Sequence, residues 1–197
     1  MISIMSRRNN ASTVTLADFL AIPEEDRFHE LLDGEIIRKA SPSGAHGGVQ
    51  AELLAVLVGL FGRPAGGEKP GGWWFAAEVE IQLGNNVCRP DLVAWRRDRV
   101  PNRPCDPLVK VVPDWAGEIL STNRGNDLVR KKHLYHRHQV PHYWIVDPAD
   151  GTLAVYRWQA EGYLEVVAAE RGDRVRAEPF DRVELTMAAL LGDDEEI

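Results

Sequence analysis

Cysteine is scarce in this sequence, with only Cys88 and Cys105 among 197 residues. The two form neither a CxxC pair nor the spacing of a zinc site, so a disulfide scaffold and a zinc finger are both excluded. Free thiols are typical of a reducing compartment. We therefore expect a cytoplasmic protein in which both thiols serve as small apolar core residues.

Long apolar runs are also missing. No run approaches the roughly 18 apolar residues that would span a bilayer, which predicts that a membrane is not a partner. Residues 1–8 lack the apolar core of a signal peptide, and residues 1–13 are expected to form a flexible leader. The length of 197 residues predicts a single domain over residues 14–191, followed by an acidic tail at residues 192–197.

An excess of positive charge is absent as well. The chain has 23 Lys and Arg against 30 Asp and Glu, a net charge of −7, which excludes a uniformly basic nucleic-acid coat. The charge is uneven, because residues 89–110 hold six basic and three acidic groups, and residues 124–142 hold five basic groups, four His and one acid. Such a basic face is compatible with DNA, although a solvated surface explains it equally well.

The residue pattern predicts helices and strands in mixed order. Apolar positions at helical spacing predict a helix over residues 46–61, and a second helix is expected over residues 126–138. β-Formers predict strands over residues 74–83, 87–95, 114–120, 142–147, 153–158 and 163–168. This order favours the α/β (α+β) class, with a central mixed β-sheet flanked by helices.

Two acids stand out because each lies in an apolar strand. Asp91 follows Pro90 in one strand, and Glu118 lies in the next. An unpaired carboxylate is costly in such a place, and a metal offsets that cost. Carboxylate oxygens are the ligands that Mg²⁺ prefers. The alternative is that Asp91 pairs with a neighbouring Arg and that Glu118 lies at a sheet edge.

Lys131 follows on the second predicted helix and is a candidate for catalysis. Its ammonium group could orient an attacking water or offset the charge that develops on a phosphate. Lys132 points about 100° away on a helix. The alternative for Lys131 is a surface pair with Asp127 that contributes only about 0.3–0.5 kcal/mol.

The ordered set of these residues resembles a known family. Asp91, Glu118 and Lys131 resemble the motif of the PD-(D/E)XK nuclease superfamily, and the likeness is narrower to the Uma-two family of restriction-endonuclease-like proteins, over roughly residues 15–190. The segments that carry it are Phe28-His29-Glu30-Leu31-Leu32-Asp33-Gly34-Glu35, His46 at a helix start, Pro90-Asp91-Leu92-Val93, Glu118-Ile119-Leu120-Ser121, Asp127 with Lys131 and Tyr135, and Val140-Pro141-His142-Tyr143-Trp144-Ile145-Val146-Asp147-Pro148.

The resemblance implies a restriction-endonuclease-like core, a bound Mg²⁺ (or Mn²⁺) and hydrolysis of phosphodiester bonds, above all in DNA. It makes Asp91 and Glu118 the metal ligands and adds Glu30, on the first helical segment, as a further catalytic acid. The sequence departs from the superfamily pattern at Leu120, which occupies the usual lysine position. Lys131 matches the place to which the family moves that lysine. His142 is a second departure, at a position where family members commonly carry Glu.

Several weaker candidates accompany this set. Glu30 could instead end a helix or pair with His29 or Arg27. Glu78 and Glu80 share one face of a predicted strand, where Glu80 is a weak metal candidate and a solvated face is the simpler interpretation. His46 could touch phosphate, although capping of its helix is the preferred interpretation.

The sequence thus predicts a metal-dependent endonuclease. Flanking phosphates would contact Arg89, Arg124 and Lys132 with salt-sensitive affinity. Cutting of both strands requires two sites, which makes a homodimer the hypothesis. The competing interpretations are a nuclease-fold binding module without catalysis and a homo-oligomeric interaction protein. Convergence of Asp91, Glu118 and Lys131 in one pocket would separate the catalytic interpretation from the first of these.

Overall fold

The structure is a computed structural model that describes residues 13–39, 41–121 and 124–193. Helices and short helical turns are α1 (Leu16–Leu20), η1 (Glu24–Asp26), α2 (Gly44–Phe61), η2 (Asn126–Lys131), α3 (Lys132–Arg137) and α4 (Met187–Leu191). The strands are β1 (His29–Leu32), β2 (Glu35–Arg38), β3 (Trp73–Ala77), β4 (Glu80–Leu83), β5 (Asn86–Cys88), β6 (Leu92–Arg96), β7 (Leu108–Val109), β8 (Trp115–Ile119), β9 (His142–Asp147), β10 (Thr152–Gln159), β11 (Gly162–Glu170), β12 (Arg174–Val175) and β13 (Leu185–Thr186).

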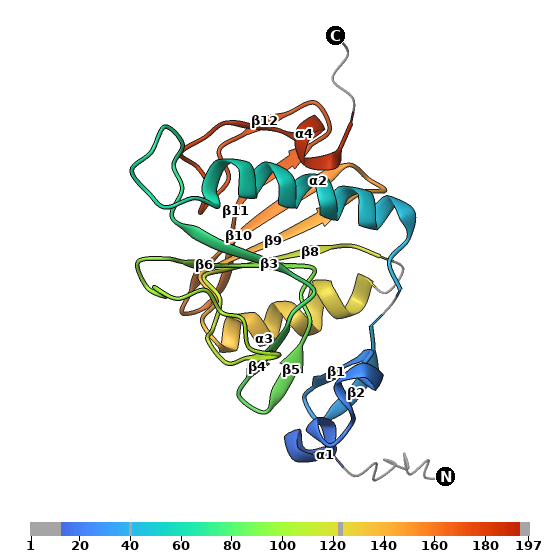
Figure 1. Cartoon of the computed structure of the whole chain (residues 1–197). Coiled ribbons are helices and arrows are strands. Elements are labelled where there is room, and N and C mark those ends of the chain that lie inside the picture. Colours follow the sequence, from blue (N-terminus) through green and yellow to red (C-terminus); the bar gives the residue numbers. More distant parts are fainter. Residues whose placement is uncertain (1–12, 40, 122–123, 194–197) are drawn as a thin grey trace, which may run out of the picture.

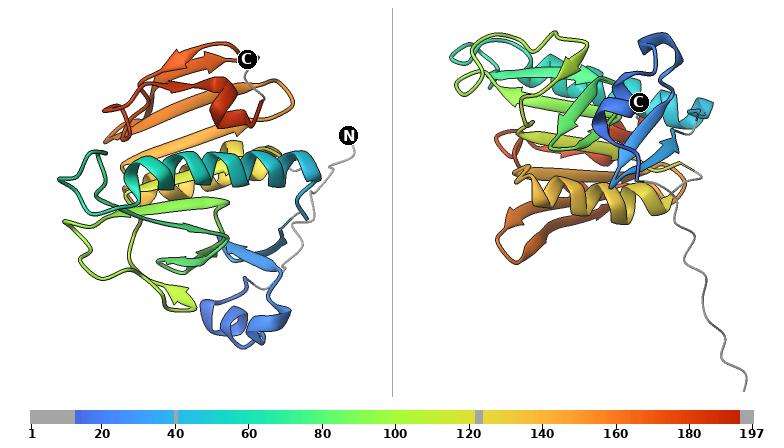
Figure 2. Two further views of the ribbon diagram at one scale, coloured as in Figure 1. Left: turned by 45° about the horizontal axis from the view of Figure 1, so that its top comes forward. Right: turned by 90° about the horizontal axis from the view of Figure 1, so that it is seen from below.

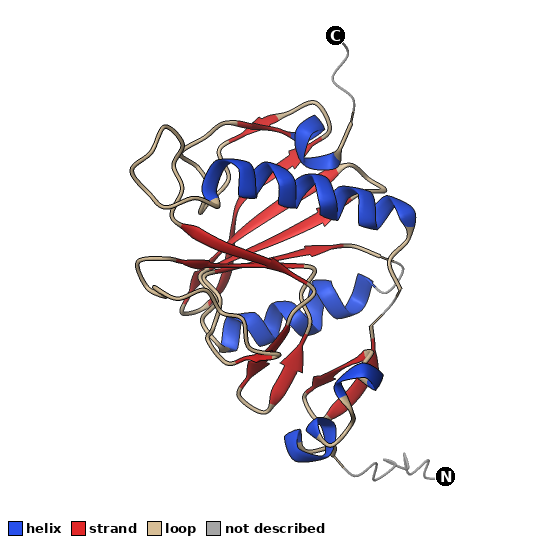
Figure 3. Cartoon of the chain, in the orientation of Figure 1, coloured by secondary structure: helices blue, strands red, loops and turns tan. Residues whose placement is uncertain are grey.

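A six-stranded sheet in the order β11-β10-β9-β8-β6-β3 forms the centre of the molecule. It is mixed, because β8 and β9 pair in parallel while the other neighbours pair antiparallel. Helix α2 covers one face of this sheet and α3 the other (Figure 1). Figure 3 shows the same arrangement as red strands between blue helices. The predicted α+β class, a mixed sheet flanked by helices, is confirmed.

Large aromatic side chains fill the space between α2 and the central sheet. Trp115 and Trp144 are fully buried and meet edge to face, with ring centroids 5.4 Å apart. Phe180 lies 5.4 Å from the Trp115 ring and 5.5 Å from the Trp144 ring. Such aromatic contacts add to the burial of apolar area and hold β8 and β9 in register. Of the two thiols, Cys88 is buried as expected, whereas Cys105 is exposed, so it is not a core residue.

A second sheet has the strand order β2-β1-β5-β4-β7. Two strands that the sequence predicts as single long elements are each divided between this sheet and the central one. The predicted strand 74–83 breaks into β3 and β4, which belong to different sheets, and Glu78 at the break has φ +55°. The predicted strand 87–95 breaks likewise into β5 and β6. Proline 90 explains the second break, because it lacks the N–H that a ladder needs. Asp91 and Glu78 thereby stand where the chain crosses from one sheet to the other.

The β1–β2 hairpin corrects the expectation of a helix around Glu30. Glu30 lies on β1, which pairs antiparallel with β2 through the Asp33–Gly34 turn. Both turn residues have positive φ, 51° and 80°, as a two-residue hairpin of this twist requires. Leu31 pairs with Val87 of β5 and so joins the hairpin to the second sheet. Both views of Figure 2 show the blue hairpin beside the green strands.

Helix α2 begins two residues earlier than predicted, and its cap is not His46. The Ser43 hydroxyl caps it by accepting the backbone N–H of His46 at 3.2 Å. By length and composition the helix could cross a membrane, with a mean hydropathy of 1.3 over 18 residues, which corrects the expectation that no run approaches that length. It buries Val49, Leu53 and Leu57 in the core, as the core helix of a globular fold does.

Candidate active site

Asp91 and Glu118 lie side by side at the junction of the two sheets. Asp91 immediately precedes β6, Glu118 lies within β8, and the two strands pair antiparallel with Leu92 opposite Gly117. The Asp91 Oδ2 atom accepts the backbone N–H of Ile119 at 2.8 Å. Asp91 is 2% exposed and Glu118 is 1% exposed. The predicted pair therefore exists as two buried carboxylates on neighbouring strands.

The Lys131 side chain extends from its helical turn to the Glu118 carboxylate. Its Nζ atom lies 3.1 Å from Glu118 Oε2, 3.1 Å from Glu30 Oε1 and 3.3 Å from Asp127 Oδ1. Asp127 and Lys131 belong to the π-helical turn η2 and are both buried. Turns of this kind are frequent at functional sites, because the wider turn changes where side chains point. A surface pair between Asp127 and Lys131, the alternative considered above, is therefore wrong.

Glu30 joins the site from β1. In addition to Lys131, its Oε1 atom accepts the backbone N–H of Arg89 at 2.7 Å. The side chain is 2% exposed. Glu30 neither ends a helix nor pairs with the neighbouring His29 or Arg27, since Arg27 pairs with Glu80 instead.

Glu80 is not part of the site. It is 4% exposed, and its carboxylate lies 3.0 Å from both the Arg27 and the Arg89 guanidinium groups. Because Glu80 is buried between two arginines, the expectation of a solvated face is wrong, and Glu80 does not line the cavity. The break after β3 separates Glu80 from Glu78, so the two do not share a strand face.

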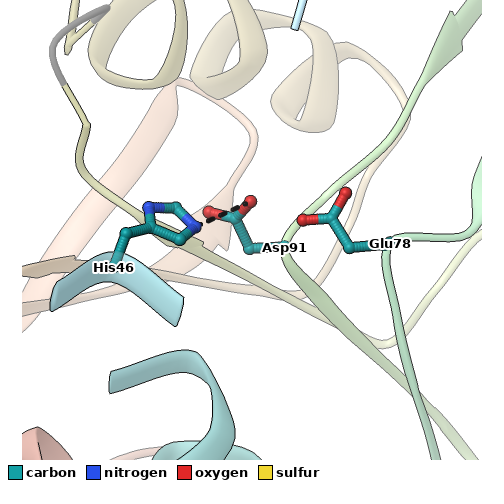
Figure 4. Close-up of side chains that lie close together, drawn as sticks. All are labelled: His46, Glu78 and Asp91. Atoms are coloured by element: carbon teal, nitrogen blue, oxygen red, sulfur yellow. Dashed lines mark ion pairs between the residues drawn. The ribbon is translucent and has the colours of Figure 1, made fainter. Parts of the chain in front are cut away.

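Two further residues at the site were missed or misassigned from the sequence. The ammonium of Lys39, just after β2, lies 2.9 Å from Asp91 Oδ1. The Nε2 atom of His46, in the first turn of α2, lies 3.5 Å from the same oxygen (Figure 4). The sequence held a signal for His46: Ser43, three residues earlier, is the better helix cap, which leaves the His46 side chain available for the site. For Lys39 the sequence has no local signal, because its role depends on where the hairpin docks.

These side chains enclose a small cavity. Its volume of about 30 Å³ is enough for one or two waters or a single ion. The lining comprises Glu30, Arg38, Lys39, Pro42, His46, Asp91, Glu118, Ile119, Ser121, Asn126, Asp127 and Lys131. Tyr135 lies behind it and donates its hydroxyl hydrogen to Glu118 Oε1 at 2.6 Å. All four residues predicted as catalytic thus converge on one cavity.

The charges at the cavity are unbalanced. Burial raises the pKa of Glu118 well above its usual range, and Lys131 only partly opposes this shift. Burial likewise raises the pKa of Asp127. Burial alone would lower the pKa of Lys131, but the carboxylates of Glu118, Glu30 and Asp127 outweigh it and raise that pKa. For Asp91, burial is outweighed by the His46 hydrogen bond and by the charge of Lys39, and its pKa falls below the usual value.

A divalent cation fits this imbalance. Four buried carboxylates, those of Glu30, Asp91, Glu118 and Asp127, face the ammonium groups of Lys39 and Lys131. Carboxyl groups whose pKa is raised by burial favour the addition of positive charge, whether as a proton or as a metal. Oxygen donors around a space for one ion match the chemistry of Mg²⁺ and Mn²⁺.

The three cations predicted to contact phosphate all have partners within the chain. Arg89 contacts Glu80 at 3.0 Å, and Lys132 lies 3.5 Å from the centre of the Tyr156 ring. Arg124 pairs with Asp147 and lies 3.5 Å from Asp150, with 45% of its side chain exposed. Arg38, in contrast, is exposed and lines the cavity.

The fold of the chain matches that of a solved structure. The crystal structure of "a putative nuclease belonging to DUF820" from Anabaena variabilis matches it with a TM-score of 0.74 and 24% sequence identity, over 91% of this chain and 98% of that one. No curated protein matches the chain. The Uma2 family, described as "Putative restriction endonuclease", matches residues 16–188. The chain belongs to this family, as the resemblance to Uma-two predicted, and this membership supports a nuclease.

Proposed function

We propose that the protein is a metal-dependent endonuclease that hydrolyses phosphodiester bonds of nucleic acid, with DNA as the substrate. One observation carries the proposal: Asp91, Glu118 and Lys131 converge on one cavity in which buried carboxylates outnumber the ammonium groups. A binding module without catalysis has no need to concentrate costly buried charge at one point. The Uma2 membership supports the nuclease class.

Asp91 and Glu118 would hold the divalent cation, Mg²⁺ or Mn²⁺. When bound, such an ion polarises a phosphoryl oxygen and lowers the pKa of a coordinated water. Two donors hold the Glu118 carboxylate in place, the Tyr135 hydroxyl at 2.6 Å and the Lys131 ammonium at 3.1 Å. Asp91 is held by the backbone N–H of Ile119. The carboxylates are thus oriented before any ligand arrives.

Lys131 would act on the phosphate or on the attacking water. Its side chain is held by carboxylates from three different elements, β1, β8 and η2, which fixes the position of the ammonium group. A preorganised positive charge offsets the negative charge that develops on a phosphoryl group without reorganisation during the reaction. Glu30 lines the cavity from β1 and acts as a positioning residue, because its carboxylate contacts the Lys131 ammonium and accepts the backbone N–H of Arg89.

Arg38 is the cation best placed to contact a flanking phosphate, because it is exposed at the cavity. Arg124 would have to leave Asp147 to do so, and Arg89 and Lys132 would have to leave Glu80 and the Tyr156 ring. A homodimer would bring two such cavities to one duplex, one for each strand. The mass of the protein in solution, alone and with duplex DNA, tests this assembly.

Cleavage of supercoiled plasmid DNA with Mg²⁺ or Mn²⁺ tests the proposal. We expect nicked or linear product from the wild-type protein, and none from Asp91→Asn or Lys131→Ala. Lys69→Ala is the matched control, because Lys69 lies outside the cavity and donates to the backbone carbonyl of Gly59, near the end of α2 opposite His46, and it should cleave as the wild type does. Cleavage that survives Asp91→Asn overturns the assigned site. A wild-type protein that cleaves neither DNA nor RNA with either metal overturns the function.

A further inference from the structure

Three possible ligand atoms gather around Asp91. The imidazole of His46, the carboxylate of Glu78 and the carboxylate of Asp91 each offer an atom, and these atoms all lie within 4.8 Å of one another. Figure 4 shows His46 and Glu78 on opposite sides of Asp91. They come from three places in the chain: the first turn of α2, the break after β3 and the approach to β6. This cluster, His46–Glu78–Asp91, differs from the Asp91–Glu118 pair because it contains a nitrogen.

The ammonium of Lys39 already lies against this cluster. Its Nζ atom is 2.6 Å from Glu78 Oε2 and 2.9 Å from Asp91 Oδ1, and it donates to the backbone carbonyl of Arg89 at 2.8 Å. These three acceptors are all oxygens of the kind that hold a small cation. The chain therefore holds a cation of its own among the carboxylates that a metal would use.

His46 is buried, and the one polar contact of its ring among the described residues is with Asp91. The imidazole is 6% exposed, and its Nδ1 atom is buried with no hydrogen-bond partner among the described residues. Ser43 caps the helix, so His46 does not. A buried imidazole normally has partners on both ring nitrogens, from the protein or from ordered water, so the protonation state of this ring is not fixed by the described residues. Without a metal, Nε2 faces Asp91 Oδ1 at 3.5 Å as a donor. Because no partner fixes the state of Nδ1, the ring proton can move to Nδ1, which frees the Nε2 lone pair for a metal between His46 and Asp91.

Glu78 combines a strained backbone with a side chain that α2 helps to position. Its backbone has φ +55°, which is strained for a side chain of this kind. Gln50, one turn after His46 on α2, donates to Glu78 Oε1 at 3.3 Å and to the Asp91 backbone carbonyl at 2.9 Å. Helix α2 thus contributes one candidate ligand and one group that orients another. Outer groups of this type fix ligands at metal sites.

We infer that His46, Glu78 and Asp91 form a nitrogen-containing cation site that shares Asp91 with the Asp91–Glu118 pair, and that Lys39 fills it until a divalent metal displaces the ammonium. Imidazole suits transition metals, whereas Mg²⁺ prefers oxygen ligands and water. The site therefore selects Mn²⁺ over Mg²⁺. The inference rests on the proposed function for the reaction that the metal serves, but the binding of the metal can be measured without cleavage.

Electron paramagnetic resonance of Mn²⁺ bound to the full-length protein tests this directly. We expect coupling of the bound Mn²⁺ to a ¹⁴N nucleus in the wild type, and loss of that coupling in His46→Gln. We also expect Glu78→Gln to weaken Mn²⁺ binding by at least about tenfold, as the loss of groups around a metal does. Glu35→Gln, an exposed carboxylate on β2 outside the cluster, is the matched control and should bind as the wild type does.

Lys39→Met separates the inference from a simple loss of folding. Because it removes the competing ammonium, it should tighten Mn²⁺ binding several-fold, whereas a damaged fold weakens binding. Bound Mn²⁺ without ¹⁴N coupling, or unchanged affinity in His46→Gln, overturns the inference. If that metal is then lost in Glu118→Gln, the proposed function still stands. If Mn²⁺ binds with ¹⁴N coupling but the protein cleaves no nucleic acid, the cation site is supported and the proposed endonuclease function is overturned.

Discussion

Lys131→Met should destabilise the metal-free protein far more than a typical lysine substitution. The Lys131 side chain is 3% exposed and contacts three carboxylates at 3.1 to 3.3 Å. Methionine keeps most of the volume but leaves Glu118, Glu30 and Asp127 without their common cation. Removal of one partner from a buried ion pair costs about 3–5 kcal/mol. For a chain of this length each kcal/mol lowers Tm by roughly 2–4 °C, so we expect a loss of roughly 6–20 °C.

Lys132→Met supplies the matched control. The same substitution one residue later removes only the contact of Lys132 with the Tyr156 ring. Such contacts are worth about 0.5–1 kcal/mol at exposed sites, so Tm should fall by roughly 1–4 °C. Thermal unfolding followed by circular dichroism in the presence of a chelator measures both variants. If Lys131→Met unfolds within a few degrees of Lys132→Met, the carboxylates of the cavity are not the coupled cluster described above.

Added metal extends this prediction. A ligand at 100 times its Kd stabilises the folded state by about 2.7 kcal/mol. In Lys131→Met the carboxylates have lost a competing positive charge, so Mn²⁺ should raise Tm by more than it does in the wild type. The same variant should remain unable to cleave DNA. Equal shifts in both proteins would mean that the metal binds elsewhere.

Three other predictions concern the same cavity. Tyr135→Phe removes the hydroxyl that donates to the Glu118 carboxylate, and urea unfolding should show a loss of about 1.5–3 kcal/mol; no loss would exclude a role in holding Glu118. Burial raises the pKa of Glu118, so the stability that this group contributes to the metal-free protein falls as pH rises above 4.5. Glu118→Gln should therefore flatten the pH dependence of Tm relative to the wild type, and parallel curves contradict this. Arg38→Ala should weaken DNA binding and reduce its salt slope by about one; an unaltered slope removes Arg38 from the phosphate contacts.

The Asp91–Glu118 pair could be predicted from the sequence because the pairing of neighbouring strands follows simple geometric rules. Asp91 and Glu118 lie in apolar segments that pair as neighbouring strands, and side chains at matched positions of such strands lie close together. Pro90 signalled the irregular backbone before Asp91. Lys131 could be placed only through the resemblance to the Uma-two family, because helical periodicity alone is equally consistent with a surface pair.

Other parts of the site depend on tertiary structure. The break at Glu78 has no signal, because a positive φ is usually marked by Gly or Asn and here falls on Glu. The segment around Glu30 contains apolar residues compatible with either a helix or a strand, and the Asp33–Gly34 turn decides for a hairpin. Lys39 meets Asp91 only because this hairpin pairs with β5 through Leu31 and Val87. The expected leader and tail at residues 1–13 and 192–197 lie mostly outside the described residues.

We propose that the cavity between Asp91, Glu118 and Lys131 is the divalent-metal centre of a nuclease. A crystal soaked in Mn²⁺ and measured at the manganese absorption edge tests it most directly. We expect an anomalous peak in contact with the carboxylates of both Asp91 and Glu118, with Lys131 still beside Glu118. A crystal in which the cavity carries no peak, while Lys39 and Lys131 keep their contacts with Asp91 and Glu118, would contradict it.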